Sequence, residues 1–190
     1  HGTVIAAPEK AAVYGNSGVE RVVNDGRLVG DISLFAGNDI IDARGGVIEG
    51  KIYGGRDNDL LITDDADTVL TEYGELGIDT VKATVTYLLS ANVERLLLLG
   101  SRNLDGTGEE GNNLLRGNAG NNRLHGLEGH DKLIGGAGND RLFGGADDDV
   151  FQFLSGGDHD RIADFEQGLD RIDVSKWKGF DDFADVLRHA

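Results

Sequence analysis

Three aspartates in the second half of the chain recur every nine residues, and their spacing suits a metal-binding site. Asp131, Asp140 and Asp149 each follow a glycine-rich stretch and precede a short apolar one. In the two preceding stretches the same place is held by Asn113 and Asn122. Such side chains offer only oxygen ligands, which calcium prefers, whereas zinc favours histidine or cysteine. The pattern therefore predicts calcium binding.

These residues belong to a nine-residue repeat. From residue 108 the chain reads GEEGNNLLR, GNAGNNRLH, GLEGHDKLI, GGAGNDRLF and GGADDDVFQ without a gap. Each unit begins with glycine, has a carboxylate or amide in sixth place and has a large apolar residue in eighth place. Glycines permit positive φ angles and tight turns, so the first six residues predict a turn. The last three predict a short strand whose eighth-place side chain points inward, and the repeat as a whole predicts a solenoid.

Two units make one full coil in this interpretation, so residues 18 apart in the sequence lie on neighbouring coils. This places Asp131 over Asp149, Asn113 under Asp131, and Asn122 under Asp140. Between stacked turns the ligands would be these side chains together with backbone carbonyls. The glycines expected to line the sites are Gly126, Gly129, Gly135, Gly136, Gly138, Gly144 and Gly145.

The units resemble the G-G-x-G-x-D-x-U-x nonapeptides of RTX (hemolysin-type) calcium-binding proteins. This resemblance implies an all-β, right-handed parallel β-roll, or β-solenoid, with several Ca²⁺ ions between its turns. It also implies secretion by the type I secretion machinery of a Gram-negative bacterium. By position it implies aspartate ligands at 131, 140 and 149, with weaker or no binding at the two asparagine units. Asp147 departs from the motif, because it stands where the fourth-place glycine belongs.

The stretch from 156 to 175 is similar to the segment that follows RTX blocks in secreted metalloproteases and epimerases. It would extend the ligand series to Asp158, which lies 18 residues after Asp140, with Asp160 as the alternative. Beyond it, apolar residues of the segment 180–187 fall on one helical face. A solenoid needs its open end covered, so we expect a short C-terminal capping helix there.

A rougher copy of the repeat lies upstream. LFAGNDIID contains Asp39, and GGRDNDLLI contains Asp57 and Asp59. Asp39 and Asp59 are 20 residues apart and could face each other across one coil, which predicts one or two further calcium sites. Glycine and aspartate also suit tight turns that bind no metal, so this alternative stays open for the upstream turns. Still earlier units, including GNSGVERVV, are interpreted as having lost the sixth-place carboxylate.

Between the two blocks the sequence predicts plain strands. Residues 80–88 alternate apolar and polar side chains, as a half-buried strand does, and VERLLLLG is expected to be a fully buried strand. This spacer also looks like one that recurs between RTX blocks of secreted proteins. The predicted organisation is an N-terminal solenoid with degenerate repeats (1–63), connecting strands (64–107), the nonapeptide β-roll (108–153) and a flanking, capping segment (154–190).

Composition limits the possible partners. The chain of 190 residues carries 34 acidic and 18 basic side chains, a net charge of -16. Such a charge argues against binding to nucleic acid or to an anionic membrane, and no apolar run is long enough to span one. The chain has no cysteine, so bound ions would take the stabilising role of disulfides in an extracellular protein. His1 in place of methionine is expected for a segment of a longer protein.

Three functions fit these observations. The first is a non-catalytic calcium-binding module that folds on calcium binding after secretion and serves as an extracellular scaffold for folding and stability. The second is the C-terminal module of a secreted enzyme such as a protease, a lipase or an alginate epimerase or lyase. The third is an adhesive surface that binds an extracellular polysaccharide. No nucleophile, oxyanion hole or HExxH motif is evident, so the chain itself is not expected to be an enzyme.

Overall fold

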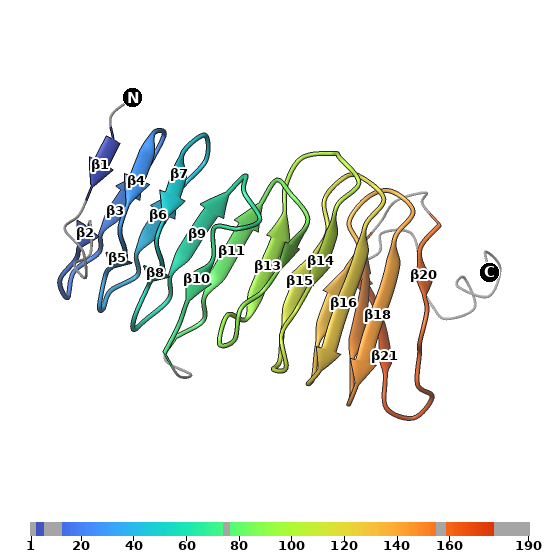
Figure 1. Cartoon of the computed structure of the whole chain (residues 1–190). Coiled ribbons are helices and arrows are strands. Elements are labelled where there is room, and N and C mark those ends of the chain that lie inside the picture. The colour runs from blue at the N-terminus through green and yellow to red at the C-terminus, as the bar shows by residue number, and fades with distance from the viewer. Residues whose placement is uncertain (1–2, 6–12, 74–76, 155–158, 177–190) are drawn as a thin grey trace.

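The computed structural model describes residues 3–5, 13–73, 77–154 and 159–176, and these form a stack of parallel strands (Figure 1). Every regular element within these ranges is a β-strand. All their strand pairs are parallel, as expected when each coil of a solenoid pairs with the next. The predicted all-β parallel solenoid is therefore confirmed, while its right-handed coiling stays a prediction.

One long sheet forms a continuous wall of the solenoid. Its nine strands in chain order are β3 (Arg21–Val23), β6 (Ile40–Asp42), β9 (Leu60–Thr63), β11 (Thr80–Ala83), β13 (Arg95–Leu98), β15 (Leu114–Arg116), β17 (Lys132–Ile134), β19 (Val150–Leu154) and β21 (Arg171–Lys176). Because the wall runs through the upstream coils, the spacer and the nonapeptides, the position-six side chains that precede its strands all lie along one edge.

Three shorter sheets complete the coils. A sheet of three contains β1 (Thr3–Ile5), β4 (Arg27–Val29) and β7 (Val47–Glu49). A sheet of four contains β2 (Val13–Tyr14), β5 (Ile32–Ser33), β8 (Ile52–Tyr53) and β10 (Leu70–Thr71). A sheet of five contains β12 (Tyr87–Leu88), β14 (Asp105–Thr107), β16 (Arg123–Glu128), β18 (Arg141–Ala146) and β20 (Arg161–Ile162).

The coil changes its length along the chain. In the upstream part β6 pairs with β9 in the register Ile40 to Leu60, and three strands make each coil. In the nonapeptide part β15 pairs with β17 in the register Leu114 to Lys132, and two strands make each coil. The shorter coil has the 18-residue length that two nine-residue units predict.

The eighth-place side chains fill the interior. All five are fully buried, and they join one apolar core that continues into the upstream coils; they are Leu115, Leu124, Leu133, Leu142 and Phe151. Complete burial of such a side chain stabilises a fold by about 1.5–3 kcal/mol. The predicted inward direction of the eighth position is therefore confirmed, and these side chains hold the turns beside them in register.

The strands of the spacer also alternate buried and outward-facing side chains, and one of them differs from the prediction. Val81 and Ala83 of β11 are buried, as the alternating pattern predicts. The expectation of a fully buried strand in VERLLLLG is wrong, because β13 alternates: Leu96 and Leu98 are buried, while Leu97 is only partly covered. A solenoid wall has one inner and one outer face, so a run of leucines cannot be buried on both. The expected capping helix at 180–187 lies outside the described residues, and the domain boundaries stay predictions.

Candidate metal centre

The sixth-place side chains of the nonapeptides are buried where each turn enters a strand. Asn113, Asp131 and Asp149 precede strands of the nine-stranded sheet, and Asn122 and Asp140 precede β16 and β18 of the five-stranded sheet. All five are at most 3% exposed, and we call them the position-six row: Asn113, Asn122, Asp131, Asp140 and Asp149. Polar side chains as deeply buried as these need partners, so their contacts show what the row can bind.

The first carboxylate oxygen of each aspartate links two coils. Asp131 Oδ1 accepts the backbone N–H of Asn113 at 2.8 Å, and Asp149 Oδ1 accepts that of Asp131 at 2.9 Å. On the alternate units, Asp140 Oδ1 accepts the N–H of Asn122 at 2.7 Å. These bonds join residues 18 apart, so the stacking predicted from the sequence is present.

The second carboxylate oxygen has a different environment. Asp131 Oδ2 and Asp149 Oδ2 are buried and have no hydrogen-bond partner in the described part of the chain. Each points toward the glycine that opens its own unit, and a side chain at Gly126 would overlap both Asp131 Oδ2 and the carbonyl oxygen of Gly144. Two oxygens therefore converge on a space that only glycine leaves open. An oxygen-only donor set of this kind fits calcium.

Burial changes the acidity of these groups. It raises the pKa of Asp131 to about 7 and that of Asp149 to about 6, each from 3.8, and neighbouring carboxylates add to the effect. The backbone N–H donors described above oppose it. Ionised carboxylates are costly to bury without a positive charge beside them. A bound divalent cation would remove that cost.

The two asparagine units close their turns without an ion. Asn122 Oδ1 accepts the backbone N–H of Asn118 at 2.9 Å, and Asn122 Nδ2 donates to the carbonyl of Leu104 at 2.8 Å. Asn113 Oδ1 accepts the N–H of Glu109 at 2.7 Å in the same way. The amide oxygen thus accepts a bond from its own turn in both units, which supports the prediction that these units bind calcium more weakly.

The row continues beyond the last nonapeptide. The backbone N–H of Asp140 donates to Asp160 Oδ1 at 2.9 Å, and that of Asp149 donates to Asp170 Oδ1 at 3.0 Å. Of the two alternatives drawn from the sequence, Asp160 therefore occupies the next place, while Asp158 lies outside the described residues. Asp170 was missed because it lies 21 residues beyond Asp149, outside the 18-residue spacing.

The predicted glycines fall into two groups. Gly126, Gly135 and Gly144 open their units and face the carboxylate of the same unit. The second-place and fourth-place glycines instead adopt positive φ angles and shape the turn; they are Gly129 (109°), Gly136 (111°), Gly138 (100°) and Gly145 (112°). The first group borders the oxygen-lined space, so its carbonyls are the better candidates for ligands.

Fourth-place aspartates join adjacent turns from the outside. Asp147 has a φ of 75°, close to the glycines that it replaces, and its Oδ2 accepts the N–H of Gly129 at 3.3 Å. The turn is therefore kept despite the departure from the motif. Asp57 is the upstream counterpart, with a φ of 76° and a bond from the N–H of Gly37 at 3.1 Å. The structure leaves Asp57 exposed and does not bring it into the buried row.

The upstream coils carry a row of their own. Asp39 and Asp59 are buried, and the N–H of Asp39 donates to Asp59 Oδ1 at 2.7 Å, so the two predicted residues do face each other. The same contact recurs from Glu20 to Asp39 and from Asp59 to Asp79, each at 2.7 Å. We call these four residues the upstream row. The oxygens Glu20 Oε2, Asp39 Oδ2 and Asp59 Oδ2 are buried without a hydrogen-bond partner.

Two members of the upstream row were missed from the sequence. Glu20 stands sixth in GNSGVERVV, so the interpretation that this unit had lost its carboxylate is wrong. Asp79 stands sixth in GELGIDTVK, a nonapeptide that was assigned to the spacer. Glu72, which is also buried, has no place in the repeat and gave no signal in the sequence. Aligning all the nine-residue units on their sixth position would have identified Glu20 and Asp79.

Comparison with known families agrees with this site. Residues 107–141 and 125–160 match the model of the RTX calcium-binding nonapeptide repeat, in four copies. No curated protein matches the chain. The segment 107–160 thus carries RTX repeats, which imply a calcium-binding module in this part of the chain. The resemblance drawn from the nonapeptides is confirmed, while the individual ligands and the number of ions stay predictions.

Proposed function

We propose that this chain is a non-catalytic scaffold that folds on binding calcium after secretion through a type I system. The observation that carries the proposal is the pair of buried, unpartnered oxygens Asp131 Oδ2 and Asp149 Oδ2, each beside a glycine that leaves room for an ion. RTX repeats are typical of type I-secreted proteins, and no helix among the described residues is long and apolar enough to cross a membrane.

Charge couples folding to calcium. The net charge is -16, so without metal the acidic side chains repel one another. The solenoid must also bury ionised carboxylates in both rows. A cytosol poor in calcium therefore favours the unfolded chain, which a secretion channel can carry. Extracellular calcium binds only the folded coils and stabilises them by mass action, by about 2.7 kcal/mol per site at a hundred times the dissociation constant.

Circular dichroism with and without calcium tests this proposal. We expect a disordered spectrum in a chelator, a β spectrum in millimolar calcium, and little change with magnesium, which tolerates irregular oxygen cages poorly. The protein should also become compact in calcium, as measured by small-angle X-ray scattering. A complete β spectrum that survives chelation would show that the solenoid does not need the ion.

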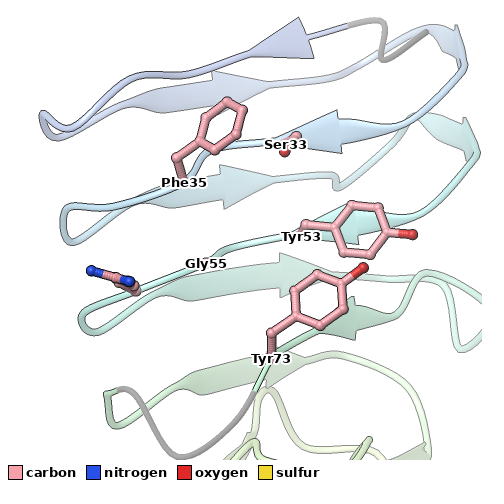
Figure 2. A pocket seen from close by; sticks show the side chains of 6 residues that line it. Ser33, Phe35, Tyr53, Gly55 and Tyr73 are labelled. Carbon is pink, nitrogen blue, oxygen red and sulfur yellow. The ribbon is translucent and has the colours of Figure 1, made fainter.

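A polysaccharide-binding surface is the second candidate, and a row of exposed aromatic rings favours it. Tyr53 and Tyr73 stack with their ring centroids 5.3 Å apart, and Tyr14 stacks with Phe35 at 6.3 Å. A groove of about 330 Å³ lies there, lined by Ser33, Phe35, Tyr53, Gly55, Arg56 and Tyr73 (Figure 2). Sugars suit such a surface, because their C–H faces pack on aromatic rings while hydroxyl and guanidinium groups bind their oxygens.

Isothermal titration calorimetry with oligosaccharides in calcium tests the second candidate. Replacing the stacked rings, as in Tyr53→Ala with Tyr73→Ala, should abolish binding without unfolding the protein. Val47→Ala on β7 is a control, since this half-exposed side chain belongs to a different sheet. Equal affinity in the wild type and the double variant would rule out the aromatic groove as the binding surface.

A further inference from the structure

Three buried carboxylates meet in the upstream coils, outside the matched repeats. Asp59 precedes β9, Glu72 follows β10 and Asp79 precedes β11. One carboxylate oxygen from each lies within 4.8 Å of the others, and the residues are 2%, 6% and 3% exposed. The cluster thus joins the residue before β9, the residue after β10 and the residue before β11.

Two of its oxygens have no hydrogen-bond partner among the residues that the structure describes. Asp59 Oδ2 and Glu72 Oε1 are buried without a hydrogen bond, although the other oxygen of each is used. Asp59 Oδ1 accepts the N–H of Asp39, and Glu72 Oε2 accepts that of Gly55 at 2.9 Å. Both orphan oxygens converge on Gly54, where any side chain would overlap them. They therefore point into one shared space.

The charges of the cluster are also unbalanced. The ion pairs Arg27–Glu49 and Arg44–Asp42 do not involve any of its members. Three carboxylates held this close in a buried place repel one another unless a cation lies between them. The unpartnered oxygens and the convergence on Gly54 indicate where that cation would sit.

We infer that Asp59, Glu72 and Asp79 form a tri-carboxylate calcium site separate from the nonapeptide block. At Gly126 of the nonapeptides, the second oxygen beside the aspartate is a glycine carbonyl, Gly144 O; at Gly54 it is the carboxylate of Glu72. The extra negative charge makes this site the tighter of the two types, because ligand charge sets calcium affinity. The inference rests on the calcium-binding function proposed above and adds a site to it.

Native mass spectrometry of the calcium-loaded chain tests this inference. Glu72→Gln should bind one ion fewer than the wild type, since an amide keeps the shape but loses the charge. Asp67→Asn is the matched control: it removes the same charge from an exposed side chain five residues away, and should bind as many ions as the wild type. If Glu72→Gln keeps every ion, the tri-carboxylate site is refuted, while the function of the repeats stands. If the wild type binds no calcium, both fail.

Tyrosine-sensitised luminescence of bound Tb³⁺ tests the same site with all three carboxylates intact, in case Glu72→Gln does not fold. Tyr53 precedes Gly54 and Tyr73 follows Glu72, whereas residues 107–160 contain no tyrosine. In a Trp177→Phe background, Tb³⁺ bound at the cluster should luminesce when tyrosine is excited. Phenylalanine does not absorb at the wavelength that excites tyrosine. The double variant Tyr53→Phe with Tyr73→Phe therefore keeps the aromatic packing and removes both sensitising rings.

With phenylalanine at both positions, the tyrosine-sensitised emission should fall about ten-fold while calcium still displaces the terbium, because the ligand charges are untouched. Weak emission from the Trp177→Phe protein itself, or equal emission after removal of both rings, would place the ion elsewhere and overturn the inference. The mass-spectrometric ion count of the double phenylalanine variant should equal that of the wild type.

Discussion

Replacement of one ligand by its amide should change stability in opposite directions with and without calcium. Asp131→Asn keeps the size of the side chain and removes its charge. In calcium, the variant loses a ligand and is less stable than the wild type. Without calcium, it no longer buries an ionised oxygen and is more stable. This opposite change is specific to a buried metal ligand.

The size of the calcium-free effect follows from the site. Burial raises the pKa of Asp131 to about 7 from 3.8, so keeping it ionised at pH 7.5 costs about 4 kcal/mol. The amide has a cost of its own, because its NH₂ group needs a partner; Asn113 Nδ2 is buried without one in the neighbouring coil. An unmade bond of this kind costs about 1–3 kcal/mol, which leaves a net gain of about 1–3 kcal/mol.

Two titrations measure the change in stability without calcium and with calcium. In a chelator, the osmolyte trimethylamine oxide drives the chain to fold, and Asp131→Asn should need less of it. In calcium, urea unfolds the chain, and the variant should unfold at a lower concentration. Asp148→Asn is the control, because it removes the same net charge from an exposed side chain in the next coil. Loss of stability in both titrations would refute the view that Asp131 is a buried metal ligand.

Three further predictions follow from the same geometry. Without calcium, the β signal in circular dichroism should fall as the pH rises from about 4 to about 7: burial raises the pKa values of Asp59, Asp131 and Asp149 above 3.8 to about 6–7, so these carboxyls stabilise the fold while protonated and lose this as they ionise. Gly126→Ala should weaken calcium binding at least about ten-fold in calorimetry, because the methyl group overlaps Asp131, whereas Gly111→Ala meets only a flexible side-chain end and should bind normally. Leu133→Ala should cost about 2–5 kcal/mol of unfolding free energy in calcium, as measured with urea, while the half-exposed Val47→Ala should cost far less.

Much of the fold could be predicted from the sequence because the repeat keeps the same residue type at the positions that pack in the interior. The eighth position must fill the interior, so Leu124 and Leu142 mark the coil without ambiguity. The run VERLLLLG misled because hydrophobicity alone does not show which face of a wall meets solvent. Only the position of Leu96 in the nine-residue register shows that its neighbour Leu97 points outward.

The candidate site was predictable where the coil length is constant. An 18-residue coil places Asp131 beside Asp149, and the structure agrees. Upstream, inserted residues lengthen the coil to 20, which hid Asp79 in the apparent spacer. Glu72 could not be found by any register, since it reaches the cluster from the end of β10 and only the stacking of turns brings it to Asp59.

The central claim is that calcium lies between the coils, against the buried carboxylates. A crystal structure of the calcium-loaded protein, with anomalous difference maps, tests it most directly. We predict anomalous peaks beside Asp131 Oδ2 and Asp149 Oδ2, at the glycines that open their units, and a further peak among Asp59, Glu72 and Asp79. Peaks confined to exposed carboxylates, with both rows free of metal, would contradict the account.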